Sequence, residues 1–582
     1  MSAKTTEKQS GEKGPLDLQV LELGGYARGV KERIQSLKKM QFGARLWQKD
    51  PGLWKEDPAD QAVITRALGW LDIAEKMQGK VEDLLRFAGQ VREAGFRQVV
   101  HMGMGGSSLA PLAFRRILPP GVLGLPLAVL DTTDPETILN LERSIPIAVT
   151  LFIVASKSGT TAEPSAFEEY FFAKVKALKG DRAGENFVVI TDPGSALEKQ
   201  AKERKYRRIV PGHVDIGGRY SALSPFGIVP GALMGLDISD LLGRARRMQK
   251  ACGPDVPVEE NPGIVLGAAL GELVGRGRDK LTFLIPEALG SLGLWLEQLL
   301  AESTGKEGRG ILPIAEEPVG KPDSYGADRI FVKMAVQGES DEALEGLVQE
   351  LIRRGDPVIT IELGERRDLV QEFYRWEVAT AALGAVLRIN PFDQPNVQES
   401  KDVTNRLLAQ VRQTGKLPEP HWALRGDPLS FYGKEEGKDG RELLKAFFDQ
   451  AGPDQYMSLQ AYLPENQSIF EGLQAIRKRI RDHFRLATTL GFGPRFLHST
   501  GQYHKGGPNR GLFLQLTAAD SADASIPDAP YSFGVLKQAQ AWGDFATLQK
   551  HGRRILGIHL GRNPIGGLNT LHRILEESLS MP

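Results

Sequence analysis

Residues 97–111 read RQVVHMGMGGSSLAP, a short apolar run that passes through a glycine-rich turn into a helix-forming segment. Similar apolar runs follow at 126–134, 149–159, 186–192 and 207–212, with helix-length segments between them. Runs of about four to seven apolar and β-branched residues bounded by turns are typical of strands buried on both faces of a parallel sheet. Residues 88–240 are therefore predicted to form one doubly wound α/β domain.

A second series of apolar runs begins after the loop at 253–263. It predicts strands at KLTFLIP (280–286), DRIFVKMAV (328–336) and DPVITIELG (356–364), and a helix at SLGLWLEQLLAES (291–303). Residues 262–415 are therefore predicted as a second α/β domain of the same doubly wound kind.

The two ends of the chain differ from these domains. Residues 1–87 are predicted to be a disordered, charged tail followed by helices, because apolar residues recur there at spacings of three and four. Residues 414–440 are rich in proline, glycine and charge and predict a linker. Beyond the linker, a helix at 469–484 and apolar runs at 494–501, 510–517 and 553–561 predict a smaller α/β domain over 440–582.

The amino-acid composition excludes several classes of protein. Of the 582 residues 25% are charged, and 73 lysines and arginines balance 73 aspartates and glutamates, which gives no sign of a nucleic-acid partner. The single cysteine, Cys252, permits neither an intramolecular disulfide nor a thiolate zinc cluster. The first residues lack the apolar core of a secretory signal, and no apolar run is long enough for a membrane span, so a cytoplasmic protein is expected.

Two strand-to-helix loops of the first domain carry groups that can bind a phosphate. These groups are Gly106 and Ser107 in GMGGSSLAP (103–111), and Ser156, Lys157, Ser158 and Thr161 in ASKSGTTAEP (155–164). Free N–H groups at a helix start bind anions, and both loops fall at the carboxyl edge of the sheet. Either loop alone is also what an ordinary helix cap looks like, whereas two at one edge favour a bound phosphate. Neither loop matches a dinucleotide fingerprint or a Walker loop, so the phosphate is expected to belong to a small ester.

The helix at 291–303 ends in residues that can move a proton. Gln298 and Glu302 are four apart and share a helix face, and Glu302 lies in the last turn before Gly305. The negative end of the helix dipole favours a proton acceptor there, which suits a general base. A solvated carboxylate at a helix end is the alternative interpretation.

Further candidates lie in turns rich in glycine or proline. Arg219 follows two glycines in DIGGRYSALSP (215–225), where the backbone can approach a ligand and a permanent positive charge would lie beside it. Gln394 and Lys401 are seven apart in NPFDQPNVQESK (390–401), and a helix beginning near Pro395 would place them on one side. A surface turn and a surface lysine are the alternatives.

Taken in order, five motifs resemble the glucose-6-phosphate isomerase family, a pair of sugar-isomerase domains. They are GMGGSSLAP, SKSGTT, GGRYSALSPFG, EQLLAESTGKEG and NPFDQPNVQESK, and they extend over roughly residues 88–405. The resemblance implies an isomerase that interconverts glucose 6-phosphate and fructose 6-phosphate through a cis-enediol(ate), with neither a metal nor another cofactor.

The resemblance also implies a role for each candidate residue. The sugar phosphate would bind at Ser107, Ser156, Lys157, Ser158 and Thr161, with Gly106 in the first of the two loops. Glu302 would move the proton between C1 and C2, and Arg219 would stabilise the negative intermediate. Gln298 and Gln394 would hold sugar hydroxyls, and Lys401 would take part in ring opening. This chemistry needs a carboxylate held against carbon and a cation beside the developing oxyanion.

The family's ring-opening histidine is absent from its usual place, because residues 303–390 contain no histidine. The stretch YHKGGPN (503–509) resembles one in compact bacterial members, so His504 is the expected histidine and His498 is the alternative.

The segment ARLWQKDPGLWKEDP (44–58) and the C-terminal domain resemble the isomerase half of fused transaldolase/glucose-6-phosphate isomerases. The chain before the first sheet is too short for the transaldolase barrel, so isomerase activity alone is expected.

The expected partner is a small hexose phosphate, with no nucleic acid and no membrane. Family members are usually dimers, and a homodimer is expected unless the histidine comes from the same chain. Two alternatives stay open. One is an isomerase that also accepts mannose 6-phosphate, and the other is a sugar-phosphate-binding regulator, which would have no use for Glu302 and Lys401.

Overall fold

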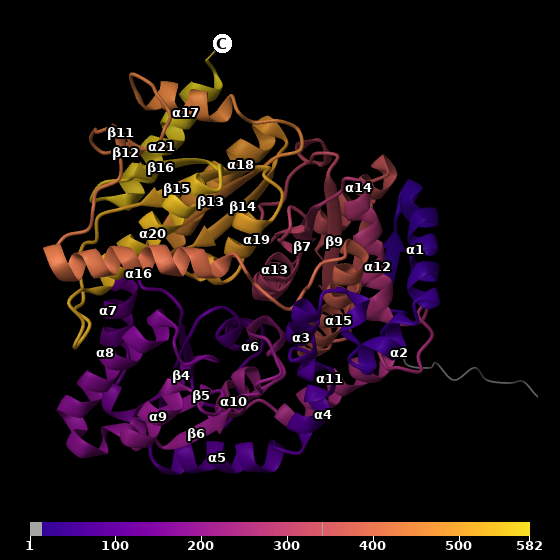
Figure 1. The fold of residues 1–582 in the computed structure, drawn as a ribbon, viewed down its shortest axis with the longest axis horizontal. Helices are drawn as coiled ribbons and strands as arrows, with labels where there is room; N and C mark the ends of the chain where they lie inside the picture. Colours follow the sequence, from indigo (N-terminus) through magenta and orange to yellow (C-terminus); the bar gives the residue numbers. More distant parts are fainter. Residues whose placement is uncertain (1–13, 340, 582) are drawn as a thin grey trace, which may run out of the picture.

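A computed structural model describes residues 14–339 and 341–581, in which three β-sheets each form the centre of an α/β unit (Figure 1). We call them the first, second and third units in chain order. The α/β class predicted from the strand pattern is confirmed. The tail predicted for the N-terminus falls largely on residues 1–13, outside the described residues.

The sheet of the first unit is wholly parallel, with strand order β3-β2-β4-β5-β6. Each strand coincides with an apolar run of the sequence, and the strands are β2 (Gln98–Gly103), β3 (Leu127–Leu130), β4 (Thr150–Ala155), β5 (Phe187–Thr191) and β6 (Arg208–Pro211). β4 is buried at every residue, which explains why its sequence TLFIVA does not alternate. Since β3 and β4 flank β2 on opposite sides, the switch point of the sheet lies at the carboxyl end of β2.

The sheet of the second unit has the order β1-β10-β9-β7-β8. Its parallel strands are β7 (Lys280–Leu284), β8 (Leu312–Ile314), β9 (Arg329–Val336) and β10 (Val358–Leu363). The edge strand β1 (Gln19–Glu22) pairs antiparallel with β10 and comes from the segment predicted to be helical. Four residues carry no period of their own, so only the distant partner strand defines β1.

The sheet of the third unit has the order β11-β12-β16-β15-β13-β14. Its parallel strands are β13 (Tyr456–Tyr462), β14 (Ala487–Phe492), β15 (Gly511–Thr517) and β16 (Arg554–His559). The segment predicted as a linker instead contributes two antiparallel strands, β11 (Trp422–Leu424) and β12 (Ser430–Tyr432). The run at 494–501 forms no strand, because a short 3-10 helix, η11 (Arg495–His498), follows β14 directly.

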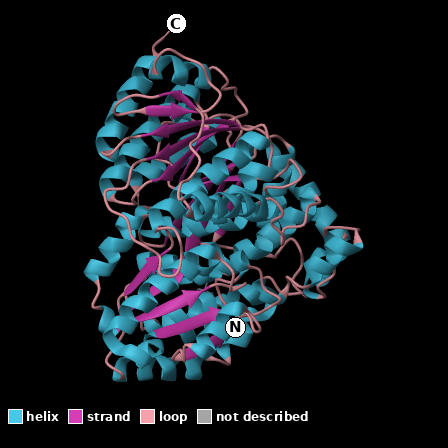
Figure 2. Cartoon of the chain, turned by 60° about the vertical axis from the view of Figure 1, so that its left-hand side comes forward, coloured by secondary structure: helices cyan, strands magenta, loops and turns pink. Residues whose placement is uncertain are grey.

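Helices bring the three units together. The helix α13 (Gly290–Thr304) contacts α6 (Leu109–Ile117) of the first unit and α19 (Gly501–Gly506) of the third. The long helix α16 (Val397–Thr414) lies along α20 (Phe533–Lys550) and runs between the third unit and the first (Figure 1). In a view turned by 60°, helices surround the strands in the upper part and in the lower part of the molecule (Figure 2). The space between the units is therefore lined by residues from all three.

Candidate active site

Two glycine-rich loops of the first unit meet near the carboxyl edge of its sheet. The 3-10 helix η4 (Gly105–Ser107) follows β2, and η7 (Gly218–Tyr220) contains Arg219. A methyl group on Gly106 would lie 2.0 Å from the Gly218 carbonyl oxygen, so glycine is required for this approach. The close contact brings the predicted phosphate loop and the predicted cation into one site.

His101 connects the first of these loops to its own strand. Its Nε2 lies 2.5 Å from the Ser107 carbonyl oxygen, and because a carbonyl only accepts, this nitrogen carries the hydrogen. Burial lowers the pKa of His101 to about 4, while the Ser107 contact acts in the opposite direction. The ring is therefore neutral at pH 7 and holds the loop through one hydrogen bond.

The hydroxyl-rich loop after β4 folds back on itself before α8 (Ala162–Lys179). Ser156 Oγ donates to Thr161 Oγ1 at 3.1 Å, and the hydroxyls of Ser158 and Thr160 are 2.9 Å apart. Lys157 Nζ donates to Asp192 Oδ2 at 2.5 Å and to the His213 carbonyl oxygen at 2.8 Å. In this arrangement the hydroxyls of the loop bond to one another, and its ammonium group is held by a neighbouring turn.

The helix α13 ends at Thr304 with Gly305 as its C-cap, as the sequence predicts. Glu302 is only 9% exposed, and its Oε2 accepts from Gln298 Nε2 at 3.0 Å. Its Oε1 lies 3.6 Å from Arg219 Nη1. The predicted base and the predicted cation, which are far apart in the sequence, are thus neighbours in a nearly buried site.

Arg219 connects the first unit to the NPFDQP loop of the second. Its Nε donates to Ser303 Oγ at 2.7 Å, and its Nη1 donates to Gln394 Oε1 at 3.0 Å. Its Nη2 donates to the carbonyl oxygens of Pro391 and Asp393 at 2.8 and 2.9 Å. A guanidinium with this many fixed partners cannot swing away from Glu302.

The helix after this loop begins at Val397 rather than near Pro395. Gln394 therefore lies in the loop just before the helix, and its placement on the same side as Lys401 stays a prediction. Lys401 lies in the first turns of α16, with its side chain exposed.

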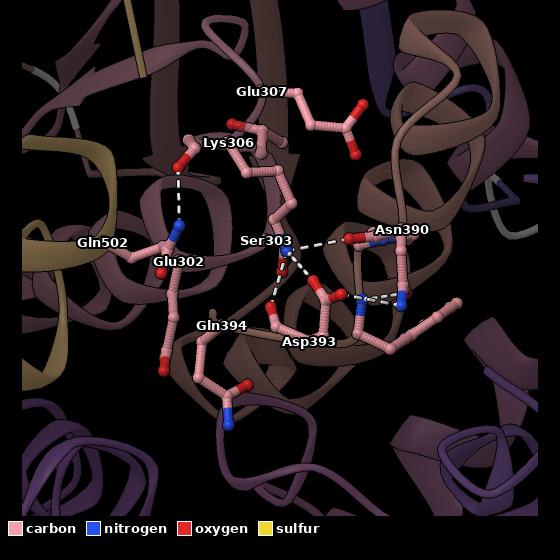
Figure 3. A network of polar contacts seen from close by, with 12 residues as sticks. Glu302, Ser303, Lys306, Glu307, Asn390, Asp393, Gln394 and Gln502 are labelled. Atoms are coloured by element: carbon pink, nitrogen blue, oxygen red, sulfur yellow. Dashed lines mark hydrogen bonds and ion pairs between the residues drawn. The ribbon is translucent and has the colours of Figure 1, made fainter. Parts of the chain in front are cut away.

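Lys306 is a further charged residue of the site, which lies in the EQLLAESTGKEG motif but received no role from the sequence (Figure 3). Its Nζ donates to the Asn390 carbonyl oxygen at 2.8 Å and to the carbonyl and Oδ1 of Asp393 at 2.5 and 2.6 Å. Burial and the charge of Arg219 lower the pKa of Lys306 to about 8, against the opposing effect of Asp393 and Glu302. Its position four residues after Glu302, just past the helix C-cap, was the signal available in the sequence.

The third unit completes the site through Gln502. This side chain donates to the Gly305 carbonyl oxygen and to Asn396 Oδ1, both at 2.8 Å, and accepts from the Asn396 backbone N–H at 2.9 Å. It therefore connects the end of α13 to the loop before α16, and it approaches Glu302 from the opposite side to the NPFDQP loop (Figure 3).

His498 and Glu163 form a pair between the third and the first units. His498 Nε2 lies 3.0 Å from Glu163 Oε1, which also accepts from Gln540 Nε2 at 2.7 Å, and the His498 carbonyl oxygen accepts from Gln298 at 2.9 Å. Burial alone would raise the pKa of Glu163, but His498 and Lys401 favour the charged carboxylate, and the pKa is lowered overall. Glu163 was missed in the sequence, although it follows the SKSGTT motif by two residues.

His504 lies in a different environment from His498. It is 2% exposed and its ring centroid lies 5.0 Å from that of Phe513 and 6.2 Å from that of Tyr456. Its Nδ1 is 3.4 Å from Gln460 Nε2, and its Nε2 has no hydrogen-bond partner among the described residues. Burial lowers the pKa of His504 well below its usual value. The structure thus brings His498, and not His504, together with Gln298 and Glu163.

Comparisons with known proteins agree with this geometry. The sequence model of a family described as phosphoglucose isomerase matches residues 62–310. A glucose-6-phosphate isomerase of Rubrobacter xylanophilus is 31% identical over 376 residues, which cover 56% of this chain and 85% of the relative. One of Thermus thermophilus is 29% identical over 388 residues, covering 59% of this chain and 90% of the relative.

Solved structures show the same arrangement of the chain. A hypothetical protein of Thermus thermophilus superposes with a TM-score of 0.56 and 26% identity, covering 67% of this chain and 100% of that one. A glucose-6-phosphate isomerase of Chlamydia trachomatis superposes with a TM-score of 0.50 and 21% identity, covering 66% and 86%, which supports the fold.

Two α/β sheets with a nearly buried carboxylate beside a fixed arginine between them define the class, an isomerase of the double-sheet α/β kind. The sequence identity of this chain to known glucose-6-phosphate isomerases, and the large share of their length that it covers, identify the family. The chain belongs to the glucose-6-phosphate isomerase family.

Proposed function

We propose that this chain interconverts glucose 6-phosphate and fructose 6-phosphate, and that Glu302 moves the proton between C1 and C2. The observation that carries the proposal is the contact of Glu302 with Arg219, 3.6 Å apart and both nearly buried. Removing a proton next to a carbonyl group leaves negative charge on oxygen, so a base and a fixed cation must act at neighbouring atoms. Arg219 is held by its other partners before the substrate arrives, so no reorganisation is needed during the reaction.

The phosphate group of the substrate would bind at the two loops of the first unit. Gly106 and Ser107 lie in the loop that Arg219 approaches, and Ser156, Ser158 and Thr161 supply hydroxyls in the other. Lys157, held by Asp192, adds positive charge to this side of the site without occupying it. The sugar would extend from the phosphate toward Glu302, with Gln298 and Gln394 beside its hydroxyls.

Ring opening is assigned to His498 rather than to His504. A closed sugar needs a proton delivered to the ring oxygen, and a histidine paired with a carboxylate is suited to hold that proton. Glu163 Oε1 lies 3.0 Å from His498 Nε2 and fixes the orientation of the ring. Lys401, whose charge acts on Glu163, would assist from the exposed side.

Replacing Glu302 tests the function. Glu302→Gln keeps the shape and the contact with Gln298 but removes the base, so kcat should fall by about 10³–10⁴. Binding of glucose 6-phosphate, measured by calorimetry in the same variant, should stay near the wild-type value because the phosphate loops are intact. Glu307→Gln, an exposed glutamate five residues away, is the matched control. Near-wild-type turnover of Glu302→Gln would remove Glu302 from the mechanism.

We further propose that one chain makes a complete site, since His498, Glu163 and Glu302 all come from the same protomer. A homodimer would then be unnecessary for catalysis, and sedimentation at the assay concentration, compared with the specific activity on dilution, tests this. A cytoplasmic location fits the sequence with its lone, buried Cys252. Along the described residues, the structure contains no helix that combines the length and apolar character of a membrane span.

A further inference from the structure

A second cleft lies on the other side of α13 from the active site. Its volume is about 1060 Å³, and all three units line it, through α6, through the start of α13 and the turn after β8, and through η11 and α18 (Gln467–Phe484). Glu297 lines this cleft, whereas its neighbour Gln298 contacts Glu302. The described residues that line the cleft include none of the catalytic or phosphate-binding residues proposed above.

The cleft occupies a position in the second unit where α/β sheets bind ligands. Phe283 and Leu284 at the end of β7 line it, as does Glu316 just after β8. Since β8 and β9 flank β7 on opposite sides, the carboxyl end of β7 is the switch point of this sheet. In the first unit the corresponding position carries the loop of Gly106, which the proposed function assigns to the substrate phosphate.

The charges of the cleft are unbalanced. Glu287, Glu297 and Glu316 line it, and none of them forms an ion pair with any described residue. Its arginines, in contrast, are already paired, because Arg116 binds Glu465, and Arg495 binds Glu465 and Asp131. The ionisable groups of this cavity that lack an ion-pair partner among the described residues are therefore carboxyl groups.

Two polar side chains of the cleft are buried and incompletely bonded. Glu297 is 6% exposed, and its Oε1 accepts from Ser499 Oγ at 3.1 Å. Ser291 is 4% exposed, and its hydroxyl has no hydrogen-bond partner among the described residues. Buried polar groups normally have partners, and groups that lack them beside a cavity are expected to meet a ligand.

The pKa of Glu297 agrees with its burial in the cleft without an ion-pair partner among the described residues. Burial and the charge of the nearby Glu316 together raise the pKa of Glu297 to about 8, against the hydrogen bond from Ser499 and the charges of Arg477 and Arg495. Burial also raises the pKa of Glu316. Burial removes the hydration that stabilises a charged carboxylate, and a bound cation would restore that stabilisation for both groups.

The remaining lining indicates an organic ligand. No three His, Cys, Asp or Glu side chains converge to hold a metal ion anywhere in residues 14–339 and 341–581. Phenylalanines supply much of the wall, among them Phe283, Phe470 and Phe492. We propose that this cleft binds an organic cation, whose ammonium group pairs with Glu297 and Glu316 and whose apolar body packs on the phenylalanines. The inference does not depend on the isomerase mechanism.

Calorimetry with a matched pair of probes tests the proposal. Phenethylamine has a cationic head and an aromatic body, and 2-phenylethanol has the same body without the charge. The amine should bind in a saturable way, and the alcohol at least about tenfold more weakly. Equal binding of the two probes, or saturable binding of neither, would overturn the proposal.

The pH dependence gives a second, independent measurement. Glu297 must lose its proton to pair with the ammonium group, so below a pH of about 8 binding should release a proton. The affinity should then rise between pH 6.5 and 8.5, and the measured heat should depend on the ionisation enthalpy of the buffer. An affinity that is flat over this range would contradict the assignment to Glu297.

Substitutions locate the site. Glu297→Gln and Glu316→Gln should each weaken phenethylamine binding by about tenfold or more, and Glu297→Gln should also remove the proton release. Glu350→Gln, an exposed residue of α14 (Glu342–Arg354), is the control and should bind like the wild type. Isomerase activity shows in each case that the variant is folded. Unchanged binding in folded Glu297→Gln would overturn the proposal without affecting the role of Glu302.

Discussion

The regions around His498 and His504 are six residues apart in the chain and differ in nearly every physical respect. His498 lies at the wall of the active site, with a carboxylate on its ring nitrogen and Gln298 on its backbone. His504 is enclosed by aromatic rings, and its Nε2 is unpaired among the described residues. A histidine that must gain and lose a proton needs the first environment, because burial without a partner prevents protonation.

This difference shows that a sequence motif can lie close to a site while its histidine, here His504, is buried in the core. In HSTGQYH, the short helix α19 turns His504 toward β13 and β15, while Gln502 in the same helix reaches the site. The role of each residue in such a stretch depends on its direction from the helix, which the motif alone does not give.

Among these predictions, the largest loss of activity is expected on replacing His498. His498→Ala should lower kcat/KM for glucose 6-phosphate by about 10², because it removes the acid that opens the ring. A four-carbon aldose phosphate has no such ring to open. The rate at which its C2 proton exchanges with solvent deuterium, followed by NMR, should therefore fall much less in His498→Ala than kcat/KM for glucose 6-phosphate. Equal losses on both substrates would mean that His498 does not act in ring opening.

A smaller effect is expected for Lys306, which holds the NPFDQP loop. Lys306→Met should lower kcat by about tenfold with a smaller change in KM, because Gln394 and the partners of Arg219 lose a fixed position. The exposed Lys321→Met is the control.

The pH profile separates this role from simple loss of stability. Since the pKa of Lys306 is lowered to about 8, its charge is lost as the pH rises through that value, and wild-type activity should decline there. Lys306→Arg keeps its charge and should keep more of its activity at pH 9. Identical alkaline limbs in the two proteins would exclude this role.

His504→Phe should change kcat/KM by no more than about twofold, because the ring replaces an aromatic neighbour of similar size and no proton transfer is lost. Steady-state assays on closed-ring substrate check this against His498→Ala. A loss as large as that of His498→Ala would return the ring-opening role to His504.

The smallest effect on activity at neutral pH is expected for His101, a buried histidine that has a partner. Its pKa of about 4 lies below the unfolded value of 6.5, so the unfolded chain binds the proton first and stability falls as the pH drops from 6.5 toward 4. Between pH 7 and pH 5 this costs about 2 kcal/mol. His101→Gln should show a smaller fall in melting temperature over this range than the wild type, and an equal fall would contradict the assignment.

Much of the fold was predictable where the sequence contains complete local signals. The strands of the first sheet are continuous apolar runs, since both faces are buried, and α13 ends at a glycine as its pattern indicates. The strands β1, β11 and β12 could not be found in this way. They have only three or four residues each and lie at or next to a sheet edge, so their hydrogen bonds to other strands define them.

The candidate site was predictable in part for a related reason. Glu302, Arg219, Gln298 and Gln394 lie in motifs distinctive enough to be selected one by one, and the structure brings them together. Glu163 and Lys306 lie near the ends of two of the sequence motifs, but only their burial among charged partners distinguishes them from surface residues.

The sequence by itself determined the class of fold, the strands of the first sheet and the choice of Glu302 and Arg219 as the candidate base and cation. These depend on local patterns, namely burial on both faces of a strand and the spacing of residues on a helix. Only the tertiary structure decided which histidine faces the site, because Glu163 and His498 come from units far apart in the chain. The choice depends on desolvation and pairing, which are properties of the packed structure and not of any short segment.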